Sequence, residues 1–370
     1  MGLEEILDRF KDREIVGGLA KKIATLAAEM DPVRLMHVCG THEHEITHHG
    51  LRQLLPKNVQ IIPGPGCPVC ICPVESIDQA ITLAYQKGIT VLTFGDMLRV
   101  PATRESLYDA RKNGGSVKMI YGPIDAIKIA MSNPDETFVF FSIGFETTAA
   151  GVAGLIKNGV PKNLLFLIAN RYIPPVFELL MKVHNKTSIQ GFILAGHAAT
   201  ITGIHPYDYM ETTYQLPCVV AGFTPVDILS AVLELLRSIE TGSHKIINAY
   251  SRVVNENGNQ AALAVMDDVF DREPGVWRGI DTIEGTAYVL KKSYSFLNAE
   301  EQLDCTPPYE SRANPPGCEC HRIMLGELSP PECKLFRKKC HPNDPYGPCM
   351  VSLEGTCHAW YANSQEELIL

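Results

Sequence analysis

The segment TFVFFSIGFETTAAGVAGLI, residues 137–156, decides how this chain folds. It is about as long as a membrane-spanning helix, but Gly144 interrupts its apolar run and Glu146 lies near its middle. A carboxylate at that depth of a bilayer is costly. A buried strand over 137–143, a tight turn and a helix over 147–157 explain the pattern better. The segment therefore predicts one strand–helix unit of a parallel sheet and no membrane span.

Similar short apolar runs, rich in β-branched residues, recur along the chain in two successive sets. Within each set their starts lie 26 to 30 residues apart, which leaves room for one crossover helix. The other predicted strands are 33–38, 59–62, 89–94, 117–120, 163–168, 189–195 and 217–220. The other predicted helices are 42–55, 74–86, 104–112, 124–131, 174–183, 225–238 and 260–270.

Strands that are apolar on both faces and alternate with helices are typical of parallel sheets. We therefore predict an α/β fold with two successive, similar parallel-sheet domains, residues 31–120 and 121–240. Residues 1–30 and 241–370 are expected to form a third, irregular domain that contains helices. In this domain a helix over 3–30 would pack against the C-terminal part.

The composition of the 370-residue chain is that of an ordinary soluble protein, with 45% hydrophobic and 20% charged residues. A net charge of −9 without a basic stripe argues against binding to nucleic acid. The N-terminus shows no secretory leader, so we expect a cytoplasmic protein. Cysteines tend to stay reduced there, and their clusters are more often metal ligands or redox groups than structural disulfides.

Cysteines concentrate near the C-terminus, where seven of the twelve lie within residues 305–357. This stretch is too poor in apolar residues to order itself without a cross-link. Four of its cysteines are spaced C-x14-C-x6-C-x16-C, namely Cys318, Cys333, Cys340 and Cys357. The lack of a C-x2-C knuckle here favours an iron–sulfur cluster over zinc, and Cys320 could replace Cys318. A zinc site that uses His321, His341 or His358 stays an alternative.

Polar and reactive residues also follow the ends of several predicted strands. Because carboxyl ends of parallel strands meet at one edge of a sheet, we expect these loops to share one cleft. The loops are CGTHEH at 39–44, PGPGCPVC at 63–70, FGDMLRVP at 94–101 and GFETT at 144–148.

Cys67 and Cys70 form a C-x-x-C pair at a predicted helix start, on a loop that Pro-Gly-Pro-Gly is expected to expose. A helix N-terminus lowers the pKa of a thiol, which suits exchange between dithiol and disulfide. The alternatives are half of a metal site or two buried thiols. Cys72 adds a third thiol nearby.

Cys39 lies at a predicted strand end with His42 and His44 close in sequence, and its thiolate would be a good soft ligand for iron. Glu146 at another strand end is a candidate proton donor, whereas Thr147 is expected to cap a helix.

Residues 44–48 read HEITH, which matches the H-E-x-x-H signature of zinc peptidases through His44, Glu45 and His48. The extended metzincin pattern fails, because Leu51 and Leu54 occupy the positions of Gly and His. A segment this rich in histidine makes a chance match easy, and a solvated helix face is the simpler reading of His48.

The chain resembles the HypD family of hydrogenase maturation proteins, on the loop motifs at 39–44, 63–70, 94–101 and 144–148 and the tail cysteines. The resemblance runs in order over nearly the whole chain. It implies a role in assembling the Fe(CN)2CO unit of [NiFe]-hydrogenases, with two α/β domains and a cluster-bearing third. It also implies a small HypC-like chaperone that shares iron with Cys39, and a HypE-like partner that delivers cyanide as a thiocyanate.

The same resemblance implies a [4Fe–4S] cluster on Cys318, Cys333, Cys340 and Cys357. We therefore hypothesise a redox-active assembly scaffold rather than a free-standing enzyme. In it, electrons pass from the cluster through Cys67 and Cys70 to the transient Fe(CN)2CO iron on Cys39, with His42 and Glu146 nearby.

A stand-alone thiol–disulfide oxidoreductase is the main alternative, and a zinc peptidase is the weaker one. The sequence assigns no role to five cysteines and does not identify the source of the carbon monoxide. The unassigned cysteines are Cys72, Cys218, Cys305, Cys320 and Cys349.

Overall fold

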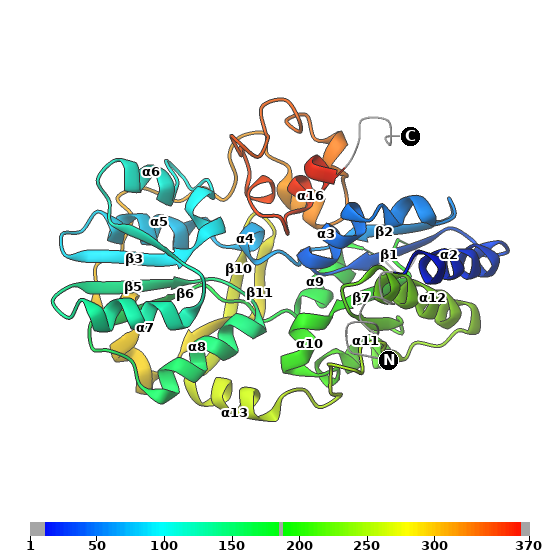
Figure 1. The fold of residues 1–370 in the computed structure, drawn as a ribbon, viewed down its shortest axis with the longest axis horizontal. Coiled ribbons are helices and arrows are strands. Elements are labelled where there is room, and N and C mark those ends of the chain that lie inside the picture. The colour runs from blue at the N-terminus through cyan, green and yellow to red at the C-terminus, as the bar shows by residue number, and fades with distance from the viewer. Residues whose placement is uncertain (1–11, 185–187, 364–370) are drawn as a thin grey trace.

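The computed structural model describes residues 12–184 and 188–363 and contains two parallel β-sheets at opposite ends of the molecule (Figure 1). The first has the strand order β2 (Val59–Pro63), β1 (Val33–His37), β7 (Gly191–Ala195), β8 (Cys218–Ala221) and β9 (Ile246–Asn248). The second has the order β4 (Val117–Ile120), β3 (Ile89–Phe94), β5 (Thr137–Ser142) and β6 (Leu164–Ile168). The predicted α/β class with two parallel sheets is confirmed.

The two sheets interleave along the chain, which differs from the expected domains 31–120 and 121–240. The chain leaves the first sheet after β2, builds all of the second sheet, and returns at β7 to lie beside β1. The apolar runs marked every strand of the two sheets except β9, but their pattern carries no information about which strands pair. Domain boundaries near residues 64 and 190 would assign all strands of the second sheet to one domain.

Helices cover both faces of each sheet (Figure 1). Those associated with the first sheet are α2 (Arg13–Ala27), α3 (Gly40–His48), α10 (Gly196–Thr202), α11 (Asp208–Thr212) and α12 (Pro225–Thr241). Those associated with the second are α5 (Val74–Ala84), α6 (Leu107–Lys112), α7 (Pro123–Ser132) and α8 (Glu146–Asn158). The segment 137–156 is the buried strand β5, a turn and helix α8, as predicted. In the described parts of the chain, no helix is long and apolar enough to cross a membrane.

The helix expected over 42–55 is shorter than predicted. It ends at His48, and Gly50 adopts a left-handed conformation with φ +61° before the short helix η1 (Leu51–Leu54). Helix α2 also corrects a prediction, since it packs against α12 and the first sheet rather than against the C-terminal region. Residues 1–11 of the expected N-terminal helix lie outside the described residues.

Residues beyond 241 contribute elements that the sequence did not predict. Besides β9, an antiparallel hairpin of β10 (Phe270–Trp277) and β11 (Asp281–Leu290) runs through the middle of the molecule (Figure 1). Helix α13 (Gln260–Val269), by contrast, was predicted over 260–270, and it packs on α8. Most of β10 is exposed and polar, so it lacks the apolar run that marked the other strands.

The cysteine-rich region forms short helices and loops above the junction of the two sheets, next to α3 and α4 (Figure 1). Its elements are α15 (Cys320–Met324), η5 (Pro330–Glu332), η6 (Pro348–Met350) and α16 (Thr356–Asn363). The other elements in the described residues are α4 (Pro68–Ile71), α9 (Val176–Val183), α14 (Ala299–Gln302), η2 (Gly95–Arg99), η3 (His205–Tyr207) and η4 (Lys292–Leu297).

Candidate thiol and metal site

The loops that follow β1 and β2 meet backbone to backbone, because these strands are neighbours in the first sheet. The N–H of Gly40 donates a hydrogen bond to the carbonyl oxygen of Gly66 over 3.0 Å. A Cβ atom on Gly66 would overlap the backbone of Cys39 and Val38. The sequence therefore places glycine where the Cys39 loop and the Cys67 loop come closest.

Cys67 and Cys70 are joined as a disulfide, with their Cα atoms 5.3 Å apart. Cys67 is the N-cap of the four-residue helix α4, and its sulfur accepts a hydrogen bond from the N–H of Cys70. The expectation of an exposed loop is wrong: the two residues are 5% and 0% exposed. The loop is buried because α4 packs against η6 of the cysteine-rich region.

Cys39 is the N-cap of α3 and is 7% exposed. Burial, reinforced by the nearby Glu354 carboxyl, raises the pKa of its thiol to about 12. Without a metal this cysteine is therefore a neutral thiol, and a metal ion would have to displace its proton. Thr41 ties the loop to the cysteine-rich region by donating a hydrogen bond to Glu354 over 2.9 Å.

His42 is fully buried one turn from Cys39. Its Nε2 lies 2.9 Å from the carbonyl oxygen of Gly222, and its ring stacks on Phe223 with centroids 4.8 Å apart. Burial lowers the pKa of His42 to about 3, so the imidazole is neutral at ordinary pH. Its Nδ1 has no hydrogen-bond partner among the described residues. His42 is thus a buried neutral imidazole, and within the described residues one of its nitrogens has no hydrogen-bond partner.

Glu43 organises the other side of the Cys39 loop. Its carboxylate accepts hydrogen bonds from Arg52 over 3.1 and 2.7 Å and from the indole N–H of Trp360 over 2.6 Å. It also pairs with Nε2 of His37 over 2.6 Å, and Nδ1 of His37 lies 3.1 Å from the carbonyl oxygen of Cys39. Burial alone would raise the pKa of Glu43, but Arg52 and His37 lower it to about 2. The sequence prediction missed this residue, although it lies inside the CGTHEH motif.

The zinc-peptidase alternative gains no support from this geometry. His44 and His48 stack with ring centroids 5.6 Å apart, as expected one turn apart on α3. Glu45, the required general base, pairs instead with His49 over 3.2 Å. Across residues 12–184 and 188–363, no group of three or more His, Cys, Asp or Glu side chains is already arranged to hold a metal ion.

Glu146 begins helix α8 and is fully buried. One of its oxygens accepts a hydrogen bond from the N–H of Ile173 over 2.7 Å, and burial raises its pKa to about 7. Its other oxygen has no partner among the described residues. Its electrostatic neighbours are Arg272, which partly offsets the effect of burial, and buried tyrosines that include Tyr207 and Tyr288. A carboxyl with this pKa can exchange a proton near neutral pH, but none of its described contacts joins it to Cys39.

The tail cysteines gather around one small cavity. Its lining includes all four predicted cluster ligands and a fifth thiol, namely Cys318, Cys333, Cys340, Cys357 and Cys320. A Cβ atom on Gly347 would overlap the sulfurs of Cys318 and Cys320, so glycine keeps this space open. The sulfurs are not preset as a closed ligand set. The donor chemistry nevertheless suits a cluster held by thiolates, and the cavity, which is about 10 Å³, would have to widen to hold one.

Two cysteines without a predicted role contact the predicted cluster ligands: Cys320 lines the cavity, and Cys349 lies on its α4 side. The sulfur of Cys320 contacts that of Cys318 at 3.3 Å and also those of Cys349 and Cys357. Cys349 belongs to η6, which packs against α4. The spacing of the tail cysteines could not predict this arrangement, because only the tertiary fold brings η6 against α4.

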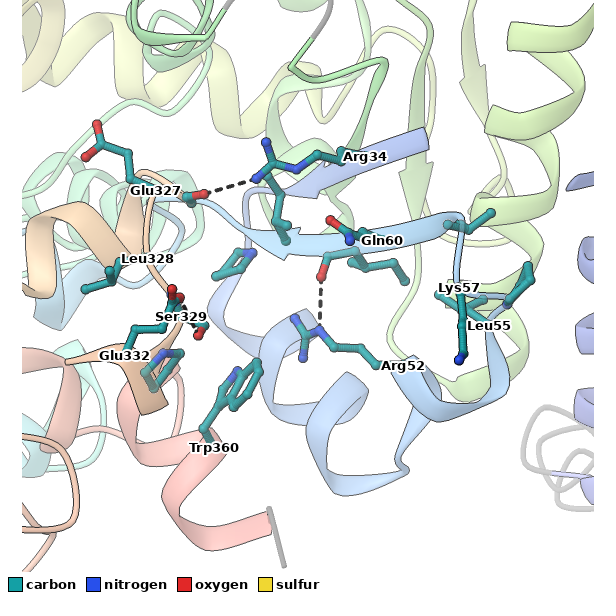
Figure 2. Close-up of a pocket in the computed structure, with 17 residues that line it drawn as sticks. Arg34, Arg52, Leu55, Lys57, Gln60, Glu327, Leu328, Ser329, Glu332 and Trp360 are labelled. Atoms are coloured by element: carbon teal, nitrogen blue, oxygen red, sulfur yellow. Dashed lines mark hydrogen bonds between the residues drawn. The ribbon is translucent and has the colours of Figure 1, made fainter. Parts of the chain in front are cut away.

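A groove of about 900 Å³ lies on the other side of the Cys39 loop, along β2, an edge strand of the first sheet. Figure 2 shows Arg52 and Trp360 approaching each other on one wall, with Lys57 at one end and Glu332 across from it. Arg52 also donates a hydrogen bond from Nε to the carbonyl oxygen of Ile61 over 3.0 Å. Arg52 and Trp360, which both line this groove, are the same side chains that donate hydrogen bonds to Glu43.

Comparison with known proteins identifies the family. Residues 14–364 match the HypD model, which is described as "Hydrogenase formation hypA family". The chain belongs to the HypD family.

Relatives of this HypD-family chain align over nearly their full length. It is 39% identical to the hydrogenase maturation factor HypD of Azotobacter vinelandii over 375 residues, which cover 97% of each chain. It is 39% identical to a putative hydrogenase expression/formation protein of Methanocaldococcus jannaschii over 353 residues, 95% of this chain and 97% of the relative. The hydrogenase maturation factor HypD of Rhodobacter capsulatus is 38% identical over 364 residues, 95% of this chain and 96% of its own.

Proposed function

We propose that this protein is a hydrogenase maturation factor that serves as the scaffold on which the Fe(CN)2CO unit is assembled, together with a HypC-like chaperone. One observation carries the proposal: the Cys39 loop lies directly against the Cys67–Cys70 loop, and a cavity lined by thiols lies behind α4. The proposed iron ligand, the thiol pair and the proposed cluster ligands thus occur in one continuous region. The family membership agrees with this role.

Cys39 is proposed to bind the iron that is being assembled, which is the cargo of this protein. Its buried, neutral thiol suits this purpose, because it resists oxidation until a metal displaces the proton. A HypC-like cysteine would complete the ligation from outside. Carbon monoxide and cyanide favour a soft, low-valent iron, which thiolate ligands stabilise.

Cys67 and Cys70 are proposed to supply reducing equivalents for cyanide release. As a dithiol the pair holds two electrons and two protons, and its oxidation forms the S–S bond. The HypE-like donor carries cyanide as a thiocyanate, R–S–C≡N. Two electrons break its S–C bond to give a thiolate and cyanide, so one dithiol balances one cyanide.

Cys318, Cys333, Cys340 and Cys357 would hold the [4Fe–4S] cluster, which supplies one-electron transfer when bound. Cys320 and Cys349, which contact this set and pack toward α4, extend the proposed thiol path to the Cys67–Cys70 pair.

Replacing Cys39 with serine is expected to abolish iron–cyanide assembly and to leave the cluster in place, because Cys39 belongs to a different loop from the tail thiols. Infrared bands of bound cyanide and carbon monoxide, measured on the complex with the HypC-like partner, should disappear. Acid-labile sulfide should stay equal to that of the wild type, and iron should fall by no more than the one atom bound at Cys39. Cys218→Ala is the matched control, because Cys218 is a fully buried thiol in β8 and should keep both signals. Loss of sulfide in Cys39→Ser would overturn the separation of roles.

A stand-alone thiol–disulfide oxidoreductase stays the alternative, because the C-x-x-C disulfide alone would suffice for it. Reduction of a small chromogenic disulfide without any partner distinguishes the two functions. Turnover that survives Cys39→Ser and loss of the cluster would favour the oxidoreductase. Turnover that requires the cluster and a reductant would favour the scaffold.

A further inference from the structure

Arg278 is a buried cation that the proposed function does not use. It lies in the turn between β10 and β11 and is 1% exposed. Its backbone N–H donates a hydrogen bond to the carbonyl oxygen of Ile71 over 3.0 Å, one residue after Cys70. Its Nε and Nη2 donate to the carbonyl oxygens of Ala313 and Pro101 over 2.7 and 2.8 Å. The residue therefore joins the disulfide loop to the segment that leads into the cysteine-rich region.

The charge of this guanidinium is not neutralised by a carboxylate. No Asp or Glu in the described parts of the chain forms an ion pair with Arg278, and its Nη1 is buried without a hydrogen-bond partner there. The hydrogen bonds of Arg278 to neutral carbonyls satisfy donors but leave the charge uncompensated. Burial of an unpaired charge is unfavourable, so an opposite charge is expected close by.

The charge of Arg278 interacts mainly with cysteines. Its electrostatic neighbours are Cys320, Cys72, Cys318 and Cys349, each of which is negatively charged only when its thiol is deprotonated, as a cluster ligand would be. The turn itself lies against α15, since a Cβ atom on Gly279 would meet Asn314 and the side chain of His321. Arg278 thus lies between α4 and the thiol-lined cavity.

We propose that Arg278 is a positioning residue that supplies the counter-charge for the thiolate-bound cluster and thereby raises its reduction potential. This inference rests on the proposed function, since it requires a cluster on the tail cysteines. Four thiolates give the group a net negative charge, and its reduced state carries one negative charge more than its oxidised state. A fixed cation therefore stabilises the reduced state more than the oxidised state.

The inference is tested by redox titration of reconstituted protein, with the cluster followed by electron paramagnetic resonance. Arg278→Gln keeps a hydrogen-bond donor but loses the charge. At a fixed potential we expect at least a tenfold lower ratio of reduced to oxidised cluster, which corresponds to a midpoint about 59 mV more negative for one electron. Arg278→Lys keeps the charge and should stay within threefold of the wild type. Arg312→Gln, an exposed residue of the neighbouring segment, is the control and should not shift the midpoint.

Each outcome distinguishes a role of charge from a role in folding. An unchanged midpoint in Arg278→Gln, or an equal shift in Arg278→Lys, would overturn the inference. Failure of the Gln variant alone to retain iron and sulfide would support it, whereas failure of both variants would overturn it, because lysine preserves the charge. If the wild-type chain itself binds no iron and sulfide, the proposed function fails instead.

Discussion

Replacing Gly66 with alanine is expected to separate the Cys39 loop from the Cys67–Cys70 loop and to prevent iron assembly. The new Cβ atom would overlap the backbone of Val38 and Cys39, and backbone atoms cannot rotate away as a side chain can. One of the two loops must therefore shift. Overpacking of this kind costs about 1–3 kcal/mol or more. The hydrogen bond from Gly40 to Gly66 should be lost as well.

Denaturant unfolding and the infrared cyanide bands together check this prediction. Gly154→Ala in helix α8 is a suitable control, because its Cβ would meet nothing within 4 Å. Alanine there should be neutral or stabilise the helix by up to about 1 kcal/mol. Wild-type stability with full iron–cyanide loading in Gly66→Ala would show that the contact between the two loops is not required.

The sequence predicted the strands well because burial on both faces leaves a clear apolar signal. Strands β3 and β4 have the predicted bounds, and the others differ by one or two residues. Their grouping failed for a physical reason: the residues that pair β1 with β7 are as apolar as those that pair β1 with β2. Strand β10 was missed because its side chains are largely exposed.

The reactive cysteines were predictable from spacing and loop position, but their surroundings were not. Pro-Gly-Pro-Gly suggests an exposed loop, yet these residues allow the backbone of Gly66 to pack against Cys39. Glu43 and Arg278 form hydrogen bonds with residues more than 200 positions away in the chain. Glu43 binds Trp360, and Arg278 binds Ile71. No local pattern encodes such contacts.

Replacing Glu43 with glutamine is expected to destabilise the protein by about 3–5 kcal/mol, as when one partner of a buried ion pair is removed. All groups around this carboxylate are donors, contributed by Arg52, Trp360 and His37. The amide offers one acceptor oxygen and turns its own N–H groups toward donors, and it leaves Arg52 without its counter-charge. Urea unfolding at pH 7 measures the loss. Glu45→Gln on the same helix is the control, because its partly exposed pair with His49 should contribute less than about 1 kcal/mol.

The pH dependence identifies the charge of Glu43 as the cause. Its pKa falls from 4.5 in the unfolded chain to about 2 in the folded protein, so the folded state binds this proton more weakly. The resulting stabilisation, about 3 kcal/mol, is fully present above the unfolded pKa and is lost as the pH falls through the folded pKa. The difference in unfolding free energy between wild type and Glu43→Gln should therefore shrink as the pH falls from 5 toward 2. A difference that stays constant over this range would assign the destabilisation to shape rather than to charge.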